Sequence, residues 1–192
     1  MSTLHTAGHP IVLIGLMGSG KSTVGRELSR RTGLPFLDMD AVIEEQVGMS
    51  IPDIFREKGE NHFRVLETAL LRYIERSVAE GQGAHIISTG GGVVLRPENR
   101  DILRRLGMTV WLNVDLPNLL QRTARAQNRP LLQVDDREAT LRELLTVRSP
   151  LYTQASHLRI NSSEMKVSEV VDSILRHANK HFKRYRGSRA QS

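Results

Sequence analysis

Residues 15–22 read Gly-Leu-Met-Gly-Ser-Gly-Lys-Ser and match the phosphate-binding pattern G-x-x-x-x-G-K-[ST] at every fixed position. An apolar run, Ile11–Ile14, precedes the segment, and a helical pattern over Ser22–Arg31 follows it. Gly18 and Gly20 permit backbone conformations in which successive N–H groups point at phosphate oxygens, and the helix adds its positive end. A glycine turn without a ligand is the alternative, but chance gives this pattern at well under about 1 in 10⁴ start positions. The segment therefore predicts nucleotide binding within a strand–loop–helix unit.

Short apolar runs alternate with amphipathic segments along the rest of the chain. The runs predict strands at Ile11–Ile14, Pro35–Leu37, His85–Ser88, Thr109–Asn113 and His157–Ile160. The amphipathic segments predict helices at Ser22–Arg31, Ala41–Val47, from Ser50 to near Gly59, Glu60–Ala79, Glu98–Leu106, Leu116–Ala126, Arg137–Val147 and Val167–Ala178. Strands separated by helices indicate βαβ units and a parallel sheet, so we expect one α/β domain.

The length of 192 residues suits one domain, and the absence of cysteine excludes disulfides, a thiolate nucleophile and Cys-bearing metal sites. The net charge of +6 raises the question of a nucleic acid or an anionic substrate. However, residues 177–192 contain five of the 27 basic residues and no acid, and the remainder carries only +1. The charge therefore favours a small anion over a nucleic acid as the ligand of the domain.

The chain divides into an N-terminal extension at 1–9, a domain at 10–176 with a candidate lid at about 128–136, and a basic tail at 177–192. We expect the tail to begin as a frayed helix end. No stretch approaches the roughly 20 apolar residues of a membrane span, and residues 1–10 lack the basic residues of a secretory signal. We therefore expect a soluble, cytoplasmic protein with no membrane partner.

Candidate ligands for a metal and an acceptor follow the second and third expected strands, where ligands gather in open parallel sheets. In the phosphate loop, Lys21 would reach the β- and γ-phosphates and Ser22 would ligate Mg²⁺. Asp38 could serve the metal, and Asp40 could act as the base for an acceptor hydroxyl, although Asp40 could equally cap the helix that follows. Three consecutive glycines at 90–92 suit a close approach of backbone to ligand, with a loose turn as the alternative.

Three arginines are further candidates, although most basic residues in any protein are simply solvated. Arg64 has acids three and four residues away, so a solvent-exposed ion pair is the plainest interpretation of it. Arg129 lies in the candidate lid and could close over the phosphates, and Arg148 could clamp a carboxylate with two hydrogen bonds. The seven histidines lack metal-binding spacing and are expected at the surface or in the tail, and Trp111 is expected in the core.

The ordered motifs together resemble the shikimate kinase family over roughly residues 10–176. After the phosphate loop the resemblance rests on Asp38-Met39-Asp40, Phe63-Arg64, Ser88-Thr89-Gly90-Gly91-Gly92, Arg129-Pro130-Leu131-Leu132 and Arg148-Ser149-Pro150-Leu151-Tyr152. It implies a three-layer α/β/α fold of the P-loop kinase type with a central five-stranded parallel sheet. It also implies transfer of the γ-phosphoryl group of ATP to the 3-hydroxyl of shikimate, in aromatic amino-acid biosynthesis. We expect the protein to be a monomer.

The resemblance further implies roles for individual residues. Lys21, Asp40 and Arg129 would be catalytic, and Ser22 and Asp38 would bind Mg²⁺. The nucleotide would be bound by Gly18, Ser19, Gly20, Lys21, Ser22, Thr23, Arg122 and Arg129, with Arg122 stacked on adenine. Shikimate would be bound by Asp40, Arg64, Gly90, Gly91, Gly92 and Arg148.

Two other functions compete with this one. A gluconate kinase would also need arginines for a carboxylate, although the triple glycine and Arg-Pro-Leu-Leu favour shikimate. A nucleic-acid-stimulated ATPase would explain the basic charge, but aromatic residues make up only 4% of the chain, which argues against base stacking.

Overall fold

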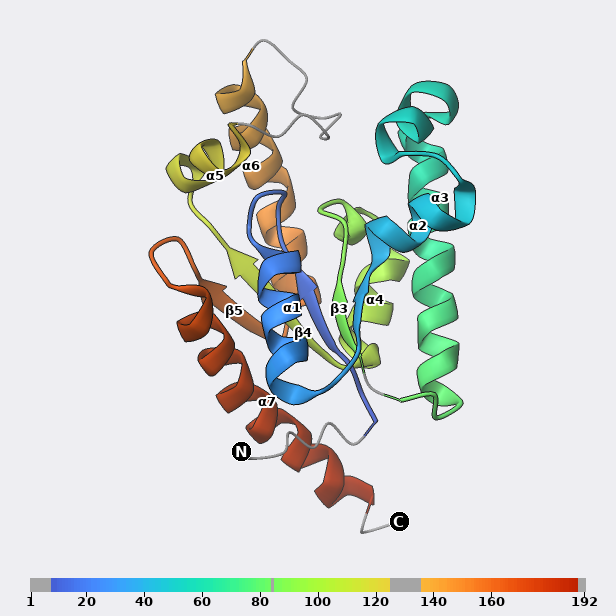
Figure 1. Ribbon diagram of the computed structural model, residues 1–192, viewed down its shortest axis with the longest axis vertical. Helices are drawn as coiled ribbons and strands as arrows, with labels where there is room; N and C mark the ends of the chain where they lie inside the picture. The colour runs from blue at the N-terminus through green and yellow to red at the C-terminus, as the bar shows by residue number, and fades with distance from the viewer. Residues whose placement is uncertain (1–7, 84, 125–135, 190–192) are drawn as a thin grey trace.

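A five-stranded parallel sheet forms the centre of the computed structural model, which describes residues 8–83, 85–124 and 136–189 (Figure 1). Its order is β2-β3-β1-β4-β5, with all neighbours parallel. The strands are β1 (Ile11–Ile14), β2 (Phe36–Asp38), β3 (Ile86–Ser88), β4 (Met108–Asn113) and β5 (Leu158–Asn161). Each of the five expected strands is confirmed to within one residue at either end.

Helices connect the strands and cover both faces of the sheet. They are α1 (Lys21–Thr32), α2 (Met39–Val47), α3 (Ile51–Ala79), the 3₁₀ turn η1 (Val93–Leu95), α4 (Pro97–Leu106), α5 (Leu116–Thr123), α6 (Arg137–Ala155) and α7 (Val167–Arg189). One face packs against α1 and α7, and the other packs against α3, α4 and α6. The expected three-layer α/β/α architecture is therefore confirmed.

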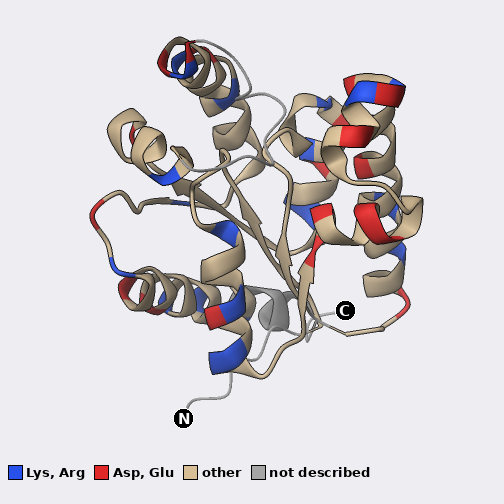
Figure 2. Cartoon of the chain, turned by 45° about the horizontal axis from the view of Figure 1, so that its top comes forward, with Lys and Arg blue, Asp and Glu red and all other residues tan. Residues whose placement is uncertain are grey.

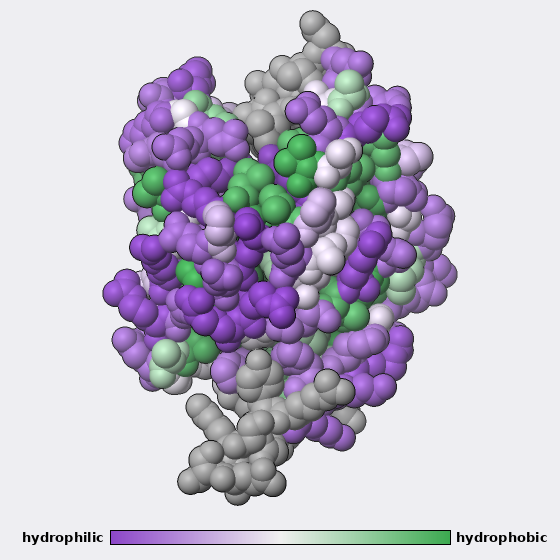
Figure 3. Space-filling model, turned by 180° about the vertical axis from the view of Figure 1, so that it is seen from behind, coloured by the Kyte–Doolittle hydropathy of each residue, from purple (hydrophilic) through white to green (hydrophobic). Residues whose placement is uncertain are grey.

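The three inner strands β1, β3 and β4 are apolar because both of their faces are buried, as in other parallel sheets. All four residues of β1 have no exposed surface, and Trp111 in β4 is 3% exposed, which confirms its place in the core. Charged residues lie mostly on the helices and leave the strands nearly free of them (Figure 2). On the face seen from behind, polar residues predominate, with smaller apolar areas between them (Figure 3). No helix in the described ranges has the length and apolar character needed to cross a membrane.

Two expected helix boundaries are confirmed in α3, whereas α2 begins at Met39, two residues before the expected start at Ala41. The α3 span contains a break at Gly59, whose φ of 81° and ψ of 162° are not helical, so the two expected helices meet there. Ser50 caps the first of them, because its hydroxyl accepts from the Asp53 N–H. By contrast, Asp38 caps α2 by accepting from the Asp40 N–H, and Asp40 lies inside the first turn. The alternative in which Asp40 is the cap is therefore wrong.

Two helices are longer than the sequence pattern suggested. Helix α6 continues from Val147 to Ala155 across Pro150. Helix α7 does not end near Ala178 but continues to Arg189, because Ala178 and Phe182 extend its buried stripe and are 0% and 1% exposed. The expected frayed end at this point is therefore wrong. The helix crosses position 176, which the sequence suggested as the end of the domain.

Candidate active site

The phosphate loop connects β1 to α1 at the carboxyl end of the sheet. Gly18 and Gly20 have φ values of 79° and 89°, in the left-handed region that favours glycine, which confirms the reason expected for both residues. The Ser19 N–H donates to the Leu16 carbonyl at 3.1 Å and closes the turn. Lys21 opens α1, and its Nζ donates to two carbonyls of the loop, at 2.9 Å from Gly15 and 3.1 Å from Leu16. The lysine is therefore already positioned beside the backbone that would surround a phosphate.

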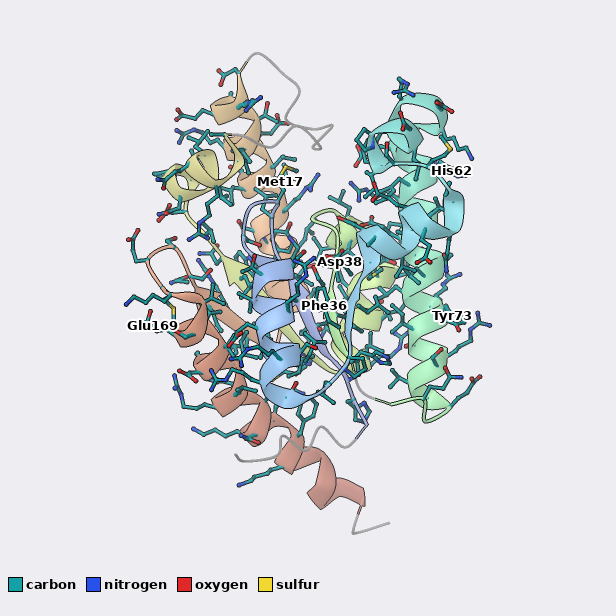
Figure 4. All side chains as sticks on the ribbon, in the orientation of Figure 1. Met17, Phe36, Asp38, His62, Tyr73 and Glu169 are labelled. Atoms are coloured by element: carbon teal, nitrogen blue, oxygen red, sulfur yellow. The ribbon has the colours of Figure 1, made fainter. Side chains whose placement is uncertain are left out.

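Three oxygen-bearing side chains meet next to the start of α1. The Ser22 hydroxyl donates to Oδ2 of Asp38 at 2.7 Å and lies 3.3 Å from Oγ of Ser88. Figure 4 shows Asp38 in the middle of the molecule, at the end of β2. Mg²⁺ prefers hard oxygen ligands and usually binds with few protein ligands, several waters and substrate phosphates. The group fits Mg²⁺ in this respect, although the described residues contain no cluster of three or more His, Asp or Glu that could hold a metal by themselves.

A cleft of about 670 Å³ runs along the phosphate loop. Its lining includes nearly all the residues expected to bind nucleotide or metal, together with two acceptor-site candidates, Asp40 and Gly91. The expected residues in the lining are Gly18, Ser19, Gly20, Lys21, Ser22, Thr23, Asp38, Asp40, Gly91 and Arg122. The structure thus brings the phosphate loop and the proposed base to one cavity.

Arg122 lies on α5, lines this cleft and donates from Nη2 to the carbonyl of Ser163 at 2.9 Å. The apolar side chains of Met165 and Val167 line the same cleft. A flat guanidinium and apolar side chains in one cleft suit an aromatic ring. Arg129 and most of the expected lid, at 128–136, lie outside the described residues.

The ion pair of Arg64 is buried, so the expectation of a solvated pair is wrong. Arg64 is 7% exposed and Glu67 has no exposed surface, and Nη1 of the arginine donates to Oε2 of the glutamate at 2.5 Å. Nε and Nη2 of Arg64 both donate to Oε1 of Glu60, at 3.0 and 2.7 Å. Three of the five guanidinium donors are thereby used to fix the orientation of the side chain.

Burial raises the pKa of Glu67 to about 7, because desolvation of the carboxylate outweighs the attraction of Arg64. Repulsion by Asp40 and attraction by Arg148 contribute to the same shift, in opposite directions. The four side chains therefore interact electrostatically at one place, although they come from α2, α3 and α6. Arg148 is 4% exposed, so both arginines expected at the acceptor are held in the protein interior.

The three glycines at 90–92 make room for these side chains. A Cβ on Gly90 would lie 2.5 Å from Oε1 of Glu67 and 2.8 Å from Oδ1 of Asp40. A Cβ on Gly92 would overlap the guanidinium of Arg64, and one on Gly91 would lie 3.7 Å from Nη1 of Arg148. A loose turn is therefore the wrong interpretation. The close approach at Gly90 and Gly92 is to the side chains of the protein itself.

Sequence reasoning assigned no role to Glu67 or to Ser88, which the structure places in this arrangement. Glu67 had a signal, since it lies four residues after Phe63 and three before Leu70 on the apolar face of α3. An acid on such a face needs a buried partner. Ser88 had a weaker signal, as the last residue of a buried strand next to the glycines.

Comparison with known proteins shows that the chain is similar to shikimate kinases over most of its length. The family model described as "Shikimate kinase" matches residues 17–179. A shikimate kinase of Thioalkalivibrio sulfidiphilus is 43% identical over 87% of this chain and 85% of its own length, and one of a Marinomonas species is 41% identical over 90% and 93%. The solved structure "Shikimate kinase from Acinetobacter baumannii in complex with shikimate" has a TM-score of 0.82 and 40% identity, and the match covers 87% of this chain and 90% of that one. A gluconokinase from Sinorhizobium meliloti, with 19% identity and a TM-score of 0.51, shares the fold alone.

Proposed function

This chain belongs to the shikimate kinase family, and we propose that its cleft transfers the γ-phosphoryl group of ATP to the 3-hydroxyl of shikimate through the residues assembled around the phosphate loop. The products are shikimate 3-phosphate and ADP, within aromatic amino-acid biosynthesis. The observation that carries the assignment of roles is the turn at Gly90–Gly92, because it packs against Asp40, Arg64 and Arg148 next to the phosphate loop.

The nucleotide half of the site cradles the phosphates. Backbone N–H groups of residues 18–23 and the start of α1 face the phosphate oxygens, and Lys21 stabilises the charge on the transferring group. Ser22 and Asp38 would hold Mg²⁺, Asp38 through water, and the ion would supply positive charge that offsets the charge of the phosphates. Arg122 stacks on the adenine, and Thr23, next to Ser22, also binds the nucleotide.

The acceptor half recognises a carboxylate and hydroxyls. Arg64 and Arg148 offer planar, fork-shaped donors that suit a carboxylate better than a lysine would. Gly90, Gly91 and Gly92 bring the backbone close to the same place. Because these groups are buried, an analogue without the matching oxygens would leave them unpaired and would be rejected.

The reaction then needs positioning and charge stabilisation more than covalent chemistry. Asp40 accepts the proton of the 3-hydroxyl as the bond from that oxygen to the γ-phosphorus forms and the bond from the phosphorus to the oxygen of ADP breaks. Arg129 stabilises the transferring group, and closure of the lid at about 128–136 excludes water. The enzyme would act as a cytoplasmic monomer without a nucleic-acid partner.

The test is an assay of ADP release with shikimate, quinate and gluconate as separate acceptors. We expect turnover with shikimate, loss of nearly all of it in Lys21→Ala, and a fall in kcat of at least about 100-fold in Asp40→Asn. Arg129→Ala should lower kcat more than it raises the KM for shikimate. Near-normal kcat in Asp40→Asn would remove the role of base from that residue, and preference for gluconate would overturn the choice of substrate.

A further inference from the structure

The hydroxyl of Tyr152 contacts the backbone of the turn formed by Gly90, Gly91 and Gly92, which we call the glycine turn. Tyr152 lies on α6, has no exposed surface, and donates a hydrogen bond of 2.5 Å to the carbonyl of Gly91, which is 61 residues away in sequence. A phenylalanine would fill the same apolar space without an oxygen that must be desolvated. The hydroxyl at this position therefore calls for a reason beyond packing.

The ring that carries this hydroxyl is itself held in place. It stacks on Trp111 of β4, with ring centroids 5.6 Å apart and planes at 30°. The guanidinium of Arg159 lies 4.5 Å from the centroid of the Trp111 ring. Burial raises the pKa of the Tyr152 hydroxyl, so it is protonated and able to donate at neutral pH. A fixed donor thus meets the carbonyl of Gly91.

That hydrogen bond constrains more than one atom. A peptide unit is planar and trans, so the Gly91 carbonyl and the Gly92 N–H point in opposite directions, and fixing the carbonyl also fixes the N–H. On one side of this peptide the turn lies against the guanidinium of Arg64, beside Gly92. Next to Gly91 it lies against the phosphate loop, since a Cβ there would be 3.4 Å from the Met17 nitrogen. The peptide held by Tyr152 therefore links a residue packed against the guanidinium of Arg64 to a residue packed against the phosphate loop and Arg148.

The same helix supplies both the tether and one of the arginines. Arg148 and Tyr152 are four residues apart on α6, so they share a face of the helix, and both are buried. We propose that Tyr152 is a positioning residue, whose hydroxyl sets the orientation of the Gly91–Gly92 peptide and aligns the acceptor with the phosphate loop. This inference rests on the proposed function for the identity of the acceptor, but not for the tether itself.

Tyr152→Phe tests the proposal, because it removes one oxygen and keeps the ring against Trp111. Tyr73→Phe is the matched control, since Tyr73 is 57% exposed and Figure 4 shows it on the outer side of α3. We expect the KM for shikimate to rise about tenfold in Tyr152→Phe, with ATP affinity within twofold of the parent and with Tyr73→Phe unchanged. Equal losses for both substrates, no change in the KM for shikimate, or failure to fold would overturn the positioning role.

A second measurement needs no acceptor and so separates this inference from the proposed function. Hydrogen exchange of the ligand-free protein reports on the Val93 and Leu95 amides, which donate to the carbonyls of Gly90 and Gly92 at 3.4 and 3.0 Å. We expect both amides to exchange about tenfold faster in Tyr152→Phe, while the Val24 amide in α1 is unchanged. Unchanged exchange at Val93 and Leu95 would contradict the tether, whichever acceptor the enzyme uses.

Discussion

Arg64 and Glu67 form an ion pair in the protein interior, with Nη1 and Oε2 2.5 Å apart and the carboxylate fully shielded from solvent. Solvent therefore does not screen the attraction between Glu67 and Arg64, one of the arginines proposed to bind the acceptor. Such a pair is not by itself a source of stability, because desolvation of both charges offsets their attraction. Its value here is geometric, since it fixes a planar donor in one orientation.

A double-mutant cycle on this pair should reveal strong coupling. Arg64→Ala would leave the carboxylate of Glu67 buried without its partner and should lower the free energy of unfolding by about 3–5 kcal/mol. Glu67→Gln should cost less, because the amide keeps the shape and Arg64 retains Glu60. In the double variant the loss should be smaller than the two single losses together by about 1–3 kcal/mol. Urea unfolding measures all four proteins, and additive losses would contradict the coupling.

Titration of Glu67 should make the free energy of unfolding depend on pH. Its pKa is about 7 in the folded protein and 4.5 ordinarily, so between these values the folded state binds more protons than the unfolded state. The contribution of Glu67 to the free energy of unfolding therefore falls as pH rises from about 4.5 to about 7, by at most about 3 kcal/mol. Denaturant titrations at several pH values should show this fall in the parent relative to Glu67→Gln. Parallel curves for the two proteins would show that Glu67 is ionised in the folded state throughout.

The sequence was sufficient for the features that depend on local patterns. The phosphate loop, the five strands and the break at Gly59 follow from motif spacing, apolar runs and glycine, all of which act over a few residues. The expected helix end near Ala178 was wrong because the many basic residues after it suggested a tail, although the apolar residues continue at helical spacing. Ile174, Ala178 and Phe182 follow one another at intervals of four, which continues the buried stripe of α7.

The features that were missed depend on contacts between distant segments. Two acids flank Arg64 in sequence, but only the turn at Gly92, packed against the guanidinium, shows that the pair is buried. Asp38 and Asp40 are equivalent candidates for a helix cap until the end of β2 is known, because a shift of the helix start by two residues would place Asp40 at the cap position. The contact between Tyr152 and Gly91 spans 61 residues and has no local signal.

A histidine at the opposite end of the sheet should make the protein sensitive to acid. The Thr109 N–H donates to Nδ1 of His157 at 3.1 Å, and the ring lies 4.9 Å from that of His181. Partial burial of the ring, together with the charges of His181 and Arg104, lowers the pKa of His157 from 6.5 to about 4. Below pH 6.5 the unfolded state therefore binds a proton that the folded state does not, so stability falls as pH falls from about 6.5 to about 4.

Asparagine at 157 would keep an acceptor for the Thr109 N–H and cannot titrate. We therefore expect His157→Asn to remove part of the loss of stability on the acid side, in unfolding titrations between pH 7 and pH 4. His62→Asn, at the surface of α3, is the control and should leave the curve of the parent unchanged. The same acid-side loss in His157→Asn as in the parent would assign the sensitivity to another group.

The glycine turn should tolerate a methyl group only at its middle position. A Cβ at residue 90 would displace the carboxylates of Glu67 and Asp40, and one at residue 92 would displace the guanidinium of Arg64. Because a misplacement of about 1 Å can cost about 100-fold in rate, Gly90→Ala and Gly92→Ala should each lower kcat/KM for shikimate by at least that factor. Gly91→Ala meets its nearest atom at 3.4 Å and should lose about tenfold or less. Steady-state kinetics on the three variants would establish the order of their losses in kcat/KM, and melting temperatures would confirm that each is folded. A larger loss for Gly91→Ala than for its neighbours would contradict this account of why the turn is built from glycine.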